Sequence, residues 1–310
     1  MKKECSLICI YLITIIAMLF WSIAFIWMKQ LFDIGFRPIT VVFFRLIVAS
    51  LFMIIICKIL KKNDIIDKKD YKFLFLLAFA EPFCYFLGEG FGMLYVTPTV
   101  ASTMVALIPL LTPIFAWFMV RERANLFQII GLIVSFFGVL ILVVDDLNLG
   151  GKLIGFLLMG IAVLSGTMFG IFLKKLVNKY SAFTITKYQT IIGMFLFMPL
   201  FFIFELEQFK SIPFRISDYQ NIIYLGALCS SLAFVILAQT VRSIGVVRMN
   251  IFTNLIPVFT AILAYFFYPD EGFTRAKIAA IVVVILGLFV SQLNKIKYFV
   301  KKDNKKCIMN

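Results

Sequence analysis

Apolar runs of about 20 residues, separated by short charged or turn-rich breaks, recur along the whole chain. A helix of about 20 apolar residues is long enough to cross the hydrocarbon core of a bilayer. Charged residues make up only 15% of the 310 residues and the mean hydropathy is +1.03, whereas soluble chains carry about 25% charged residues. The sequence therefore predicts an all-α membrane protein that crosses the bilayer many times.

The apolar runs predict ten transmembrane helices. They cover residues 7–28, 39–57, 72–92, 98–120, 126–144, 153–173, 184–204, 219–241, 248–268 and 277–293. With the N-terminus in the cytoplasm, 22 of the 30 Lys and Arg residues fall on the inner side and seven on the outer side, and Arg45 lies within the second span. The positive-inside rule therefore predicts a multi-pass protein of the inner or plasma membrane with both termini in the cytoplasm.

The net charge of +14 does not indicate a nucleic-acid partner, because the basic residues lie in short loops and in a C-terminal tail at 294–310. These segments are expected to lie against the anionic headgroups of membrane lipids. Histidine is absent and the six cysteines show no CxxC spacing, so no metal and no cofactor are expected.

Part of the chain repeats. The stretch LIPLLTPIFAWFMV (Leu107 to Val120) matches LIPVFTAILAYFFY (Leu255 to Tyr268) at seven of 14 positions, including Pro109 and Pro257. The predicted repeats cover 1–145 and 150–293. Five helices is an odd number, so the second repeat enters the membrane with opposite polarity, an arrangement typical of secondary transporters. A duplication kept only for stability is the alternative.

The first copy, ASTMVALIPLLTPIFAWFMVRERANLFQIIGLIVSFFGVLIL, and its partner NIFTNLIPVFTAILAYFF resemble the EamA-type branch of the drug/metabolite transporter superfamily. The matching positions are Pro109, Glu122, Gln128, Gly131 and Gly138. The departures are Arg121 in place of a glycine, and Asp270, Lys277 and Ala280 in the second copy. The resemblance implies that helices 1–4 and 6–9 surround a central cavity, with helices 5 and 10 alongside. The family moves amino acids, other metabolites and drugs, so no single substrate is implied.

The third span contains FAEPFCYFLGEG, with two acidic residues in an apolar run. Glu81, Tyr85 and Glu89 are spaced four residues apart and share one helical face. Gly88 and Gly92 lie close to this face and allow a neighbouring helix to approach. A charged side chain at the bilayer centre costs about 2.5–3.5 kcal/mol on insertion scales, so such residues normally face a cavity or the interior of the bundle. The three side chains are therefore candidates for substrate contact or proton coupling.

Arg45 in the second span lies at nearly the same depth as Glu89, and the sequence predicts an ion pair between them. Glu89 is then either a structural partner of Arg45 or a ligand of the substrate. Glu81 lies deeper, and because desolvation disfavours a charged carboxylate, it is a candidate carrier of a coupling proton. The alternative is that Glu81 satisfies a backbone donor freed at Pro82.

Two further polar residues, Gln239 and Asn254, are candidates for the cavity wall, although each could equally form an ordinary interhelical hydrogen bond. Proline kinks helices by removing a backbone donor. We therefore expect Pro109, Pro113 and Pro257 to bend the fourth and ninth spans and to act as gating joints.

These features predict a secondary active or facilitative transporter that moves a small organic metabolite, amino acid or drug by alternating access. Export is expected, and proton coupling and simple exchange are both open. No P-loop is present, so direct driving by ATP is not expected. Uptake by the same fold is one alternative. The other is an intramembrane enzyme acting on a lipid-linked substrate, but the only pair of adjacent aspartates, Asp145 and Asp146, lies at a span end and histidine is absent.

Overall fold

The protein is described by a computed structural model that covers residues 7–112, 115, 126–148, 152–212, 216–245, 249, 252–268, 274–287 and 289–290. Within these ranges every regular element is a helix and no strand is present. Six of the described helices are long and apolar enough to cross a membrane. Shorter apolar helices cover Pro98–Thr112, Ile129–Ile141 and Leu255–Phe267. These findings confirm an all-helical, multi-pass membrane protein.

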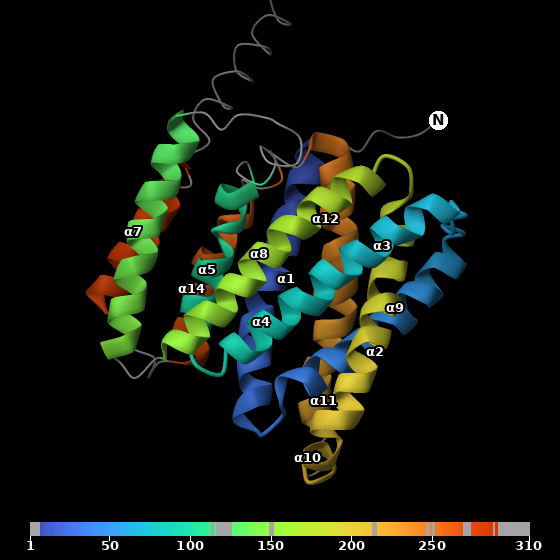
Figure 1. Cartoon of the computed structure of the whole chain (residues 1–310), viewed down its shortest axis with the longest axis horizontal. Helices are drawn as coiled ribbons and strands as arrows, with labels where there is room; N and C mark the ends of the chain where they lie inside the picture. The colour runs from blue at the N-terminus through green and yellow to red at the C-terminus, as the bar shows by residue number, and fades with distance from the viewer. Residues whose placement is uncertain are drawn as a thin grey trace, which may run out of the picture.

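In the described part of the first half, bounds are defined for six α-helices and two short irregular helices, and residues 108–112 are also helical (Figure 1). They are α1 (Leu7–Asp33), α2 (Pro38–Ile59), η1 (Lys68–Asp70), α3 (Tyr71–Ala78), η2 (Phe79–Cys84), α4 (Tyr85–Gly92), α5 (Pro98–Val105) and α7 (Leu126–Asn148). The segments α3, η2 and α4 follow one another without a gap and together form the predicted third span.

The second half has a similar order of helices. They are α8 (Leu153–Leu176), α9 (Ala182–Leu200), η3 (Phe201–Glu205), α10 (Leu206–Lys210), α11 (Ile216–Tyr224), η4 (Leu225–Leu232), α12 (Ala233–Ile244) and α14 (Leu255–Phe267). A further helix covers 275–287. Both η2 and η4 are π-helical, with wider turns than an α-helix. Segments of this kind often occur at functional sites.

Local sequence explains where several helices begin. Pro38 and Pro98 occupy the first turns of α2 and α5, where a missing backbone donor has no cost and the fixed φ suits the helix. The hydroxyl of Ser181 accepts a hydrogen bond from the backbone N–H of Thr184 and so caps α9. Gly245 adopts φ +86° and ends α12, a conformation that only glycine takes at low cost.

Glycines allow close packing between helices of the two halves, which lie side by side in Figure 1. A Cβ atom at Gly88 on α4 would lie 2.6 Å from the carbonyl oxygen of Leu158 on α8. One at Gly92 would lie 2.9 Å from the side chain of Met159. The expectation that Gly88 and Gly92 admit a neighbouring helix is confirmed, and it explains the tight α4–α8 contact.

The helices α7 and 275–287 pair with each other at one side of the bundle (Figure 1). The hydroxyl of Ser135 on α7 donates to the carbonyl oxygen of Val284 at 3.1 Å, and a Cβ at Gly138 would lie 2.7 Å from the Val284 side chain. Gly287 packs against Ser135. This pair corresponds to the fifth and tenth predicted spans, and it lies beside the central bundle.

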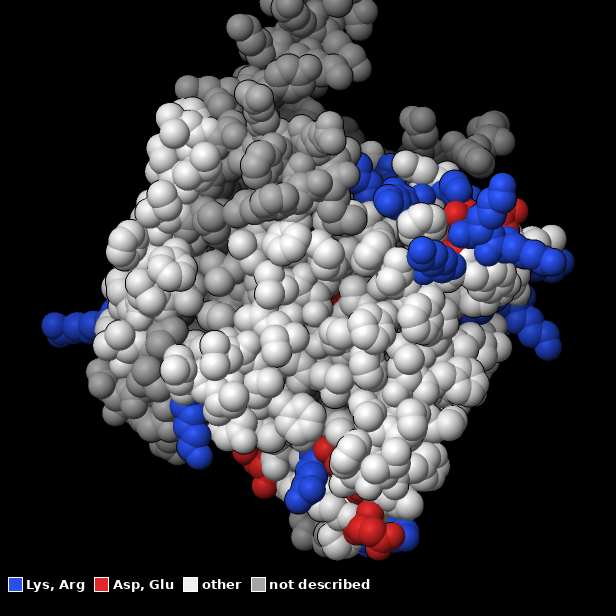
Figure 2. Space-filling model, in the orientation of Figure 1, with Lys and Arg blue, Asp and Glu red and all other residues white. Residues whose placement is uncertain are grey.

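Basic residues gather at one end of the bundle, as Figure 2 shows. They lie in the connection between α2 and α3 and at the end of α8: Lys58, Lys61, Lys62, Lys68, Lys69, Lys72, Lys174 and Lys175. Asp70 in the first of these segments bonds to Lys179 and Tyr180 just beyond α8, so the two basic segments are adjacent. The charge asymmetry predicted from the sequence is therefore a feature of the folded surface.

Candidate functional site

A cavity of about 90 Å³ lies in the bundle between helices of the first and second halves. One water molecule needs roughly 10–15 Å³ measured this way, so the cavity has room for a small organic group. Its polar lining residues are Arg45, Glu81, Tyr85, Glu89, Thr112 and Thr253, and its aromatic ones are Trp21, Phe25, Phe86, Phe169 and Phe234. A concave, mostly apolar site with a few converging polar groups is the usual form of a small-molecule site.

The helix is broken at Glu81, where the backbone is extended with φ −146° and ψ +118°. The following residue, Pro82, has no backbone N–H and cannot continue the α-helical hydrogen-bond ladder. The side-chain amide of Gln189 on α9 donates to the Glu81 carbonyl oxygen at 3.1 Å and so satisfies this part of the broken backbone. The irregular turn is therefore held by a helix of the other half.

Glu81 is buried and is one of the residues that line the cavity. Glu81 is 9% exposed, and its carboxyl forms no hydrogen bond or ion pair with any residue that the structure describes. The alternative in which this carboxylate binds a backbone donor freed at Pro82 is thus not supported. A buried acidic group without a protein partner is available to a ligand or a proton.

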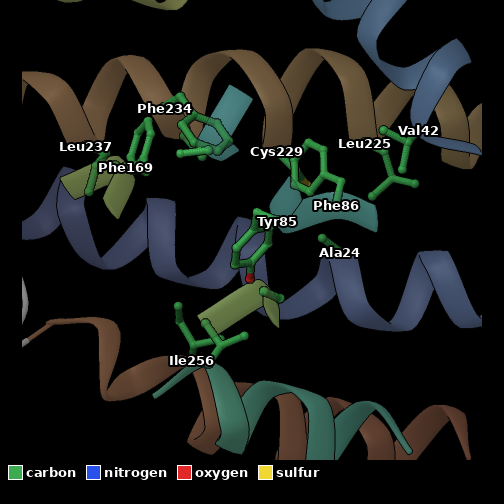
Figure 3. Close-up of a cluster of buried hydrophobic side chains, with 14 of the residues drawn as sticks. Ala24, Val42, Tyr85, Phe86, Phe169, Leu225, Cys229, Phe234, Leu237 and Ile256 are labelled. Carbon is green, nitrogen blue, oxygen red and sulfur yellow. The ribbon is translucent and has the colours of Figure 1, made fainter. Parts of the chain in front are cut away.

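Tyr85 and Glu89 lie on the regular helix α4 and line the same cavity. The Tyr85 hydroxyl donates a hydrogen bond to Glu89 Oε1 at 3.0 Å. The cavity thus contains the three side chains that the spacing in FAEPFCYFLGEG predicted to share a face, although the chain at Glu81 is not helical. Figure 3 shows Tyr85 between Phe86 on one side and Phe169 and Phe234 on the other.

The predicted ion pair between Arg45 and Glu89 is wrong: no N–O distance within 4.0 Å joins them, although both residues are described and both line the cavity. Arg45 Nε instead donates to the hydroxyl of Ser230 at 2.8 Å, and its Nη1 lies 3.4 Å from the sulfur of Met28. The guanidinium carbon is 4.1 Å from the centre of the Phe86 ring. Similar depth in the membrane did not determine the direction in which Arg45 points.

The prediction that Gln239 lines the cavity is also wrong, because this residue is exposed on α12. Leu237 and Val241 line the cavity, and a residue two positions away from each points to the opposite side of an α-helix. Asn254 is half-buried directly before α14 and does not line the cavity, whereas Thr253 does.

A model of the EamA-like transporter family matches residues 8–144 of this chain and matches it again at residues 153–293. The chain belongs to the EamA-like transporter family. Each match contains half of the cavity wall, with Arg45, Glu81 and Glu89 in the first and Phe169 and Phe234 in the second.

Several curated proteins are similar to this EamA-like chain. The uncharacterized transporter YetK of Bacillus subtilis (strain 168) is 26% identical over 262 residues, covering 81% of this chain and 77% of YetK. An uncharacterized transporter of Archaeoglobus fulgidus is 24% identical over 282 residues, covering 90% of this chain and 97% of the relative. A solved crystal structure superposes with a TM-score of 0.67 at 16% identity, covering 92% of this chain and 98% of the other. That likeness concerns the fold alone.

The prolines of this EamA-like protein lie close to helix interruptions. The helix that contains α5 is interrupted by a turn at Ala106 and Leu107, shortly before Pro109. A turn at Asn254 similarly precedes Pro257. Pro113 lies outside the described residues, as do Arg121, Glu122, Asp270 and Glu271. A turn thus precedes each of Pro109 and Pro257, and the expected kinks and their role in gating remain predictions.

Sequence reasoning missed that η4 positions Arg45, which lines the EamA-like cavity. Ser230 holds Arg45, and a Cβ at Gly226 would lie 2.6 Å from the Arg45 carbonyl oxygen. The available signal was the run of small residues GALCSS from Gly226 to Ser231, which is typical of closely packed membrane helices. Such a run identifies a contact surface but not the helix that occupies it.

Proposed function

We propose that this protein is a secondary transporter, active or facilitative, that moves a small organic molecule through the central cavity by alternating access. The observation that carries the proposal is that Glu81 is buried, lines a cavity built by both halves and has a carboxyl group without a described protein partner. A structural acid in a membrane core is normally paired. An unpaired one at a helix break is suited to a ligand that binds and leaves.

The proposed topology has ten membrane helices in two five-helix repeats of opposite polarity. Both termini lie in the cytoplasm, and the protein lies in the inner or plasma membrane of the cell. The double match to the family supports the repeats. The basic cluster at one end of the bundle supports the orientation, since cytoplasmic loops carry an excess of Lys and Arg. We expect this cluster to contact anionic lipid headgroups.

The shape of the cavity supports export. From the level of Arg45 and Glu89 it extends to Leu173 and Val241, close to the ends of α8 and α12. The end of α8 adjoins the basic cluster and is therefore cytoplasmic in the proposed orientation. A substrate would enter from the cytoplasm when the protein has this conformation.

Hydrogen bonds between helices close the opposite end of the bundle. Glu205 bonds to the first turn of α2, and the Asn221 amide donates to the Gln30 side chain at 3.1 Å. The hydroxyl of Tyr268 donates to Asp33 at 3.1 Å. Alternating access requires these contacts to separate when the outer side opens.

Glu81 is the proposed carrier of a coupling proton. Binding of a proton removes a buried charge that costs about 2.5–3.5 kcal/mol at the centre of a membrane helix. The titratable and charged groups that share the cavity with it are Glu89, Tyr85 and Arg45. Without proton coupling, the same cavity serves a facilitative exchanger.

The first test is a metabolite profile of the medium around cells that express the wild type, Glu81→Gln, Glu207→Gln or no transporter. Glu207 lies on α10 and its side chain is 86% exposed, so its variant is the matched control. We expect one compound to accumulate outside cells with the wild type and Glu207→Gln only, at equal amounts of protein in the membrane. Equal export by Glu81→Gln would refute the role of Glu81. Depletion of a compound from the medium would indicate uptake, and a new compound in both cells and medium would indicate an enzyme.

A further inference from the structure

We infer that the cavity selects an organic monocation with an apolar, ring-sized body. The inference rests on the proposed function only for the claim that this ligand is transported, because binding can be measured without transport. Three observations carry it: the balance of charge in the cavity, the partners that its charged groups already have, and the arrangement of its aromatic walls.

The charged side chains of the cavity leave one negative charge in excess when all are ionised, since Glu81 and Glu89 face a single cation, Arg45. A low-dielectric site strengthens the attraction between an uncompensated charge and a ligand of opposite sign. An anionic substrate would add a second uncompensated negative charge. A monocation brings the cavity to neutrality.

The partners of these groups favour the same sign of ligand. Arg45 is held in place by the protein, because its Nε donates to Ser230, its Nη1 contacts the sulfur of Met28 and its guanidinium lies against the face of Phe86. The Glu81 carboxyl has no partner among the described residues, and both of its oxygens are acceptors when it is ionised. The Glu81 carboxylate is therefore a negatively charged hydrogen-bond acceptor that is free to bind a ligand.

Aromatic rings line the wall next to these acids. Trp21 and Phe234 lie edge to face with ring centres 5.3 Å apart, and Phe169 and Phe234 do so at 5.8 Å. Aromatic faces attract ammonium groups, and this attraction increases when the ligand is desolvated. Figure 3 shows Phe169, Phe234 and Leu237 together on one side of Tyr85. The apolar body of the ligand would pack against this side of the cavity, and its cationic group would contact the carboxylates.

Direct binding to the purified full chain tests the inference. The probe is benzyltrimethylammonium, whose charge does not change with pH. The comparison ligands are phenylacetate as the anion, phenylacetamide as the neutral molecule and phenylalanine as the zwitterion. We expect calorimetric titration to give at least a tenfold tighter Kd for the monocation than for any of the other three.

Three variants identify the binding group. Glu81→Gln should weaken binding of benzyltrimethylammonium at least tenfold, whereas Glu81→Asp should stay close to the wild type because it retains the charge. Glu207→Gln is the exposed control and should not change the Kd. Each variant must elute as one species and melt at the wild-type temperature, so that a loss of binding is not a loss of folding.

Several outcomes would overturn the inference. They are no binding of the monocation by the wild type, equal or tighter binding of the anion, the neutral molecule or the zwitterion, and unchanged binding by Glu81→Gln. A flux assay in liposomes separates this inference from the proposed function. Binding of the monocation without any flux would contradict the transporter proposal and leave the ligand class standing. Glu81-dependent export of an anion would support the transporter proposal and contradict the ligand class.

Discussion

The backbone N–H and the hydroxyl group of Thr40 both donate to the same carboxylate oxygen of Glu205, at 2.6 Å and 2.7 Å. Glu205 lies on η3 in the second half of the chain, 2% exposed, and Thr40 lies in the first turn of α2. A carboxylate at the N-terminus of a helix satisfies free N–H groups and interacts favourably with the helix dipole. One acidic side chain thus attaches η3 to the first turn of α2.

Glu205→Gln should lower the free energy of unfolding by about 1.5–3 kcal/mol, because hydrogen bonds to a charged group are replaced by weaker ones at a buried site. Chemical denaturation in detergent measures the change. Glu207→Gln, two residues further along and exposed, should change stability by no more than about 0.5 kcal/mol. Equal effects of the two variants would show that Glu205 does not stabilise α2.

Gly88→Ala should destabilise the protein by about 1–3 kcal/mol, because the new methyl group would meet the backbone of α8 at Leu158 and Ala162. The matched control is Gly160→Ala on α8, where no atom lies within 4 Å of the added Cβ. Alanine favours a helix over glycine by about 0.5–1 kcal/mol, so the control should be neutral or stabilising. Thermal melting of the two variants measures the difference, and a melting temperature that falls equally in both would contradict the close packing.

The contact between Arg45 and Ser230 should appear as a coupling energy. A double-mutant cycle with Arg45→Lys and Ser230→Ala is expected to give about 0.5–3 kcal/mol, since lysine keeps the charge but lacks the Nε–H that donates to Ser230. Unfolding in denaturant measures the four proteins. Additive effects would mean that the two residues do not interact in the folded protein.

The contribution of Asp64 to the stability of the folded protein should depend on pH. Burial acts to raise its pKa, but hydrogen bonds from Ser181 and Thr184 and the charge of Lys62 outweigh that effect and hold the pKa below its usual range. A lowered folded-state pKa means that this stabilisation is complete above the unfolded-state pKa of about 3.9 and is lost as the pH falls below it. Melting temperatures of the wild type and Asp64→Asn should differ at pH 7 and converge in stronger acid. A difference that stays constant down to pH 3 would contradict the assignment.

Much of the fold could be predicted from the chain alone. The length and apolarity of a segment are local properties, so runs of apolar residues identified the helices. The positive charges in the loops distinguished one end of the bundle from the other. The repeated LIP segments, with Pro109 and Pro257, indicated where two helices are interrupted. Glu81, Tyr85 and Glu89 line one cavity, although the helical spacing from which this was predicted holds only for Tyr85 and Glu89.

Only the tertiary structure decided which side chains meet. Arg45 was predicted to pair with Glu89 at the same depth, but it binds Ser230, and Gln239 faces away from the cavity that its neighbours line. Sequence determines the depth of a residue along a membrane helix, because depth follows from its distance to the ends of the apolar run. The direction of a side chain around the axis, and the helix it faces, depend on how separate helices pack, which is settled by shape and small-residue contacts far apart in the chain.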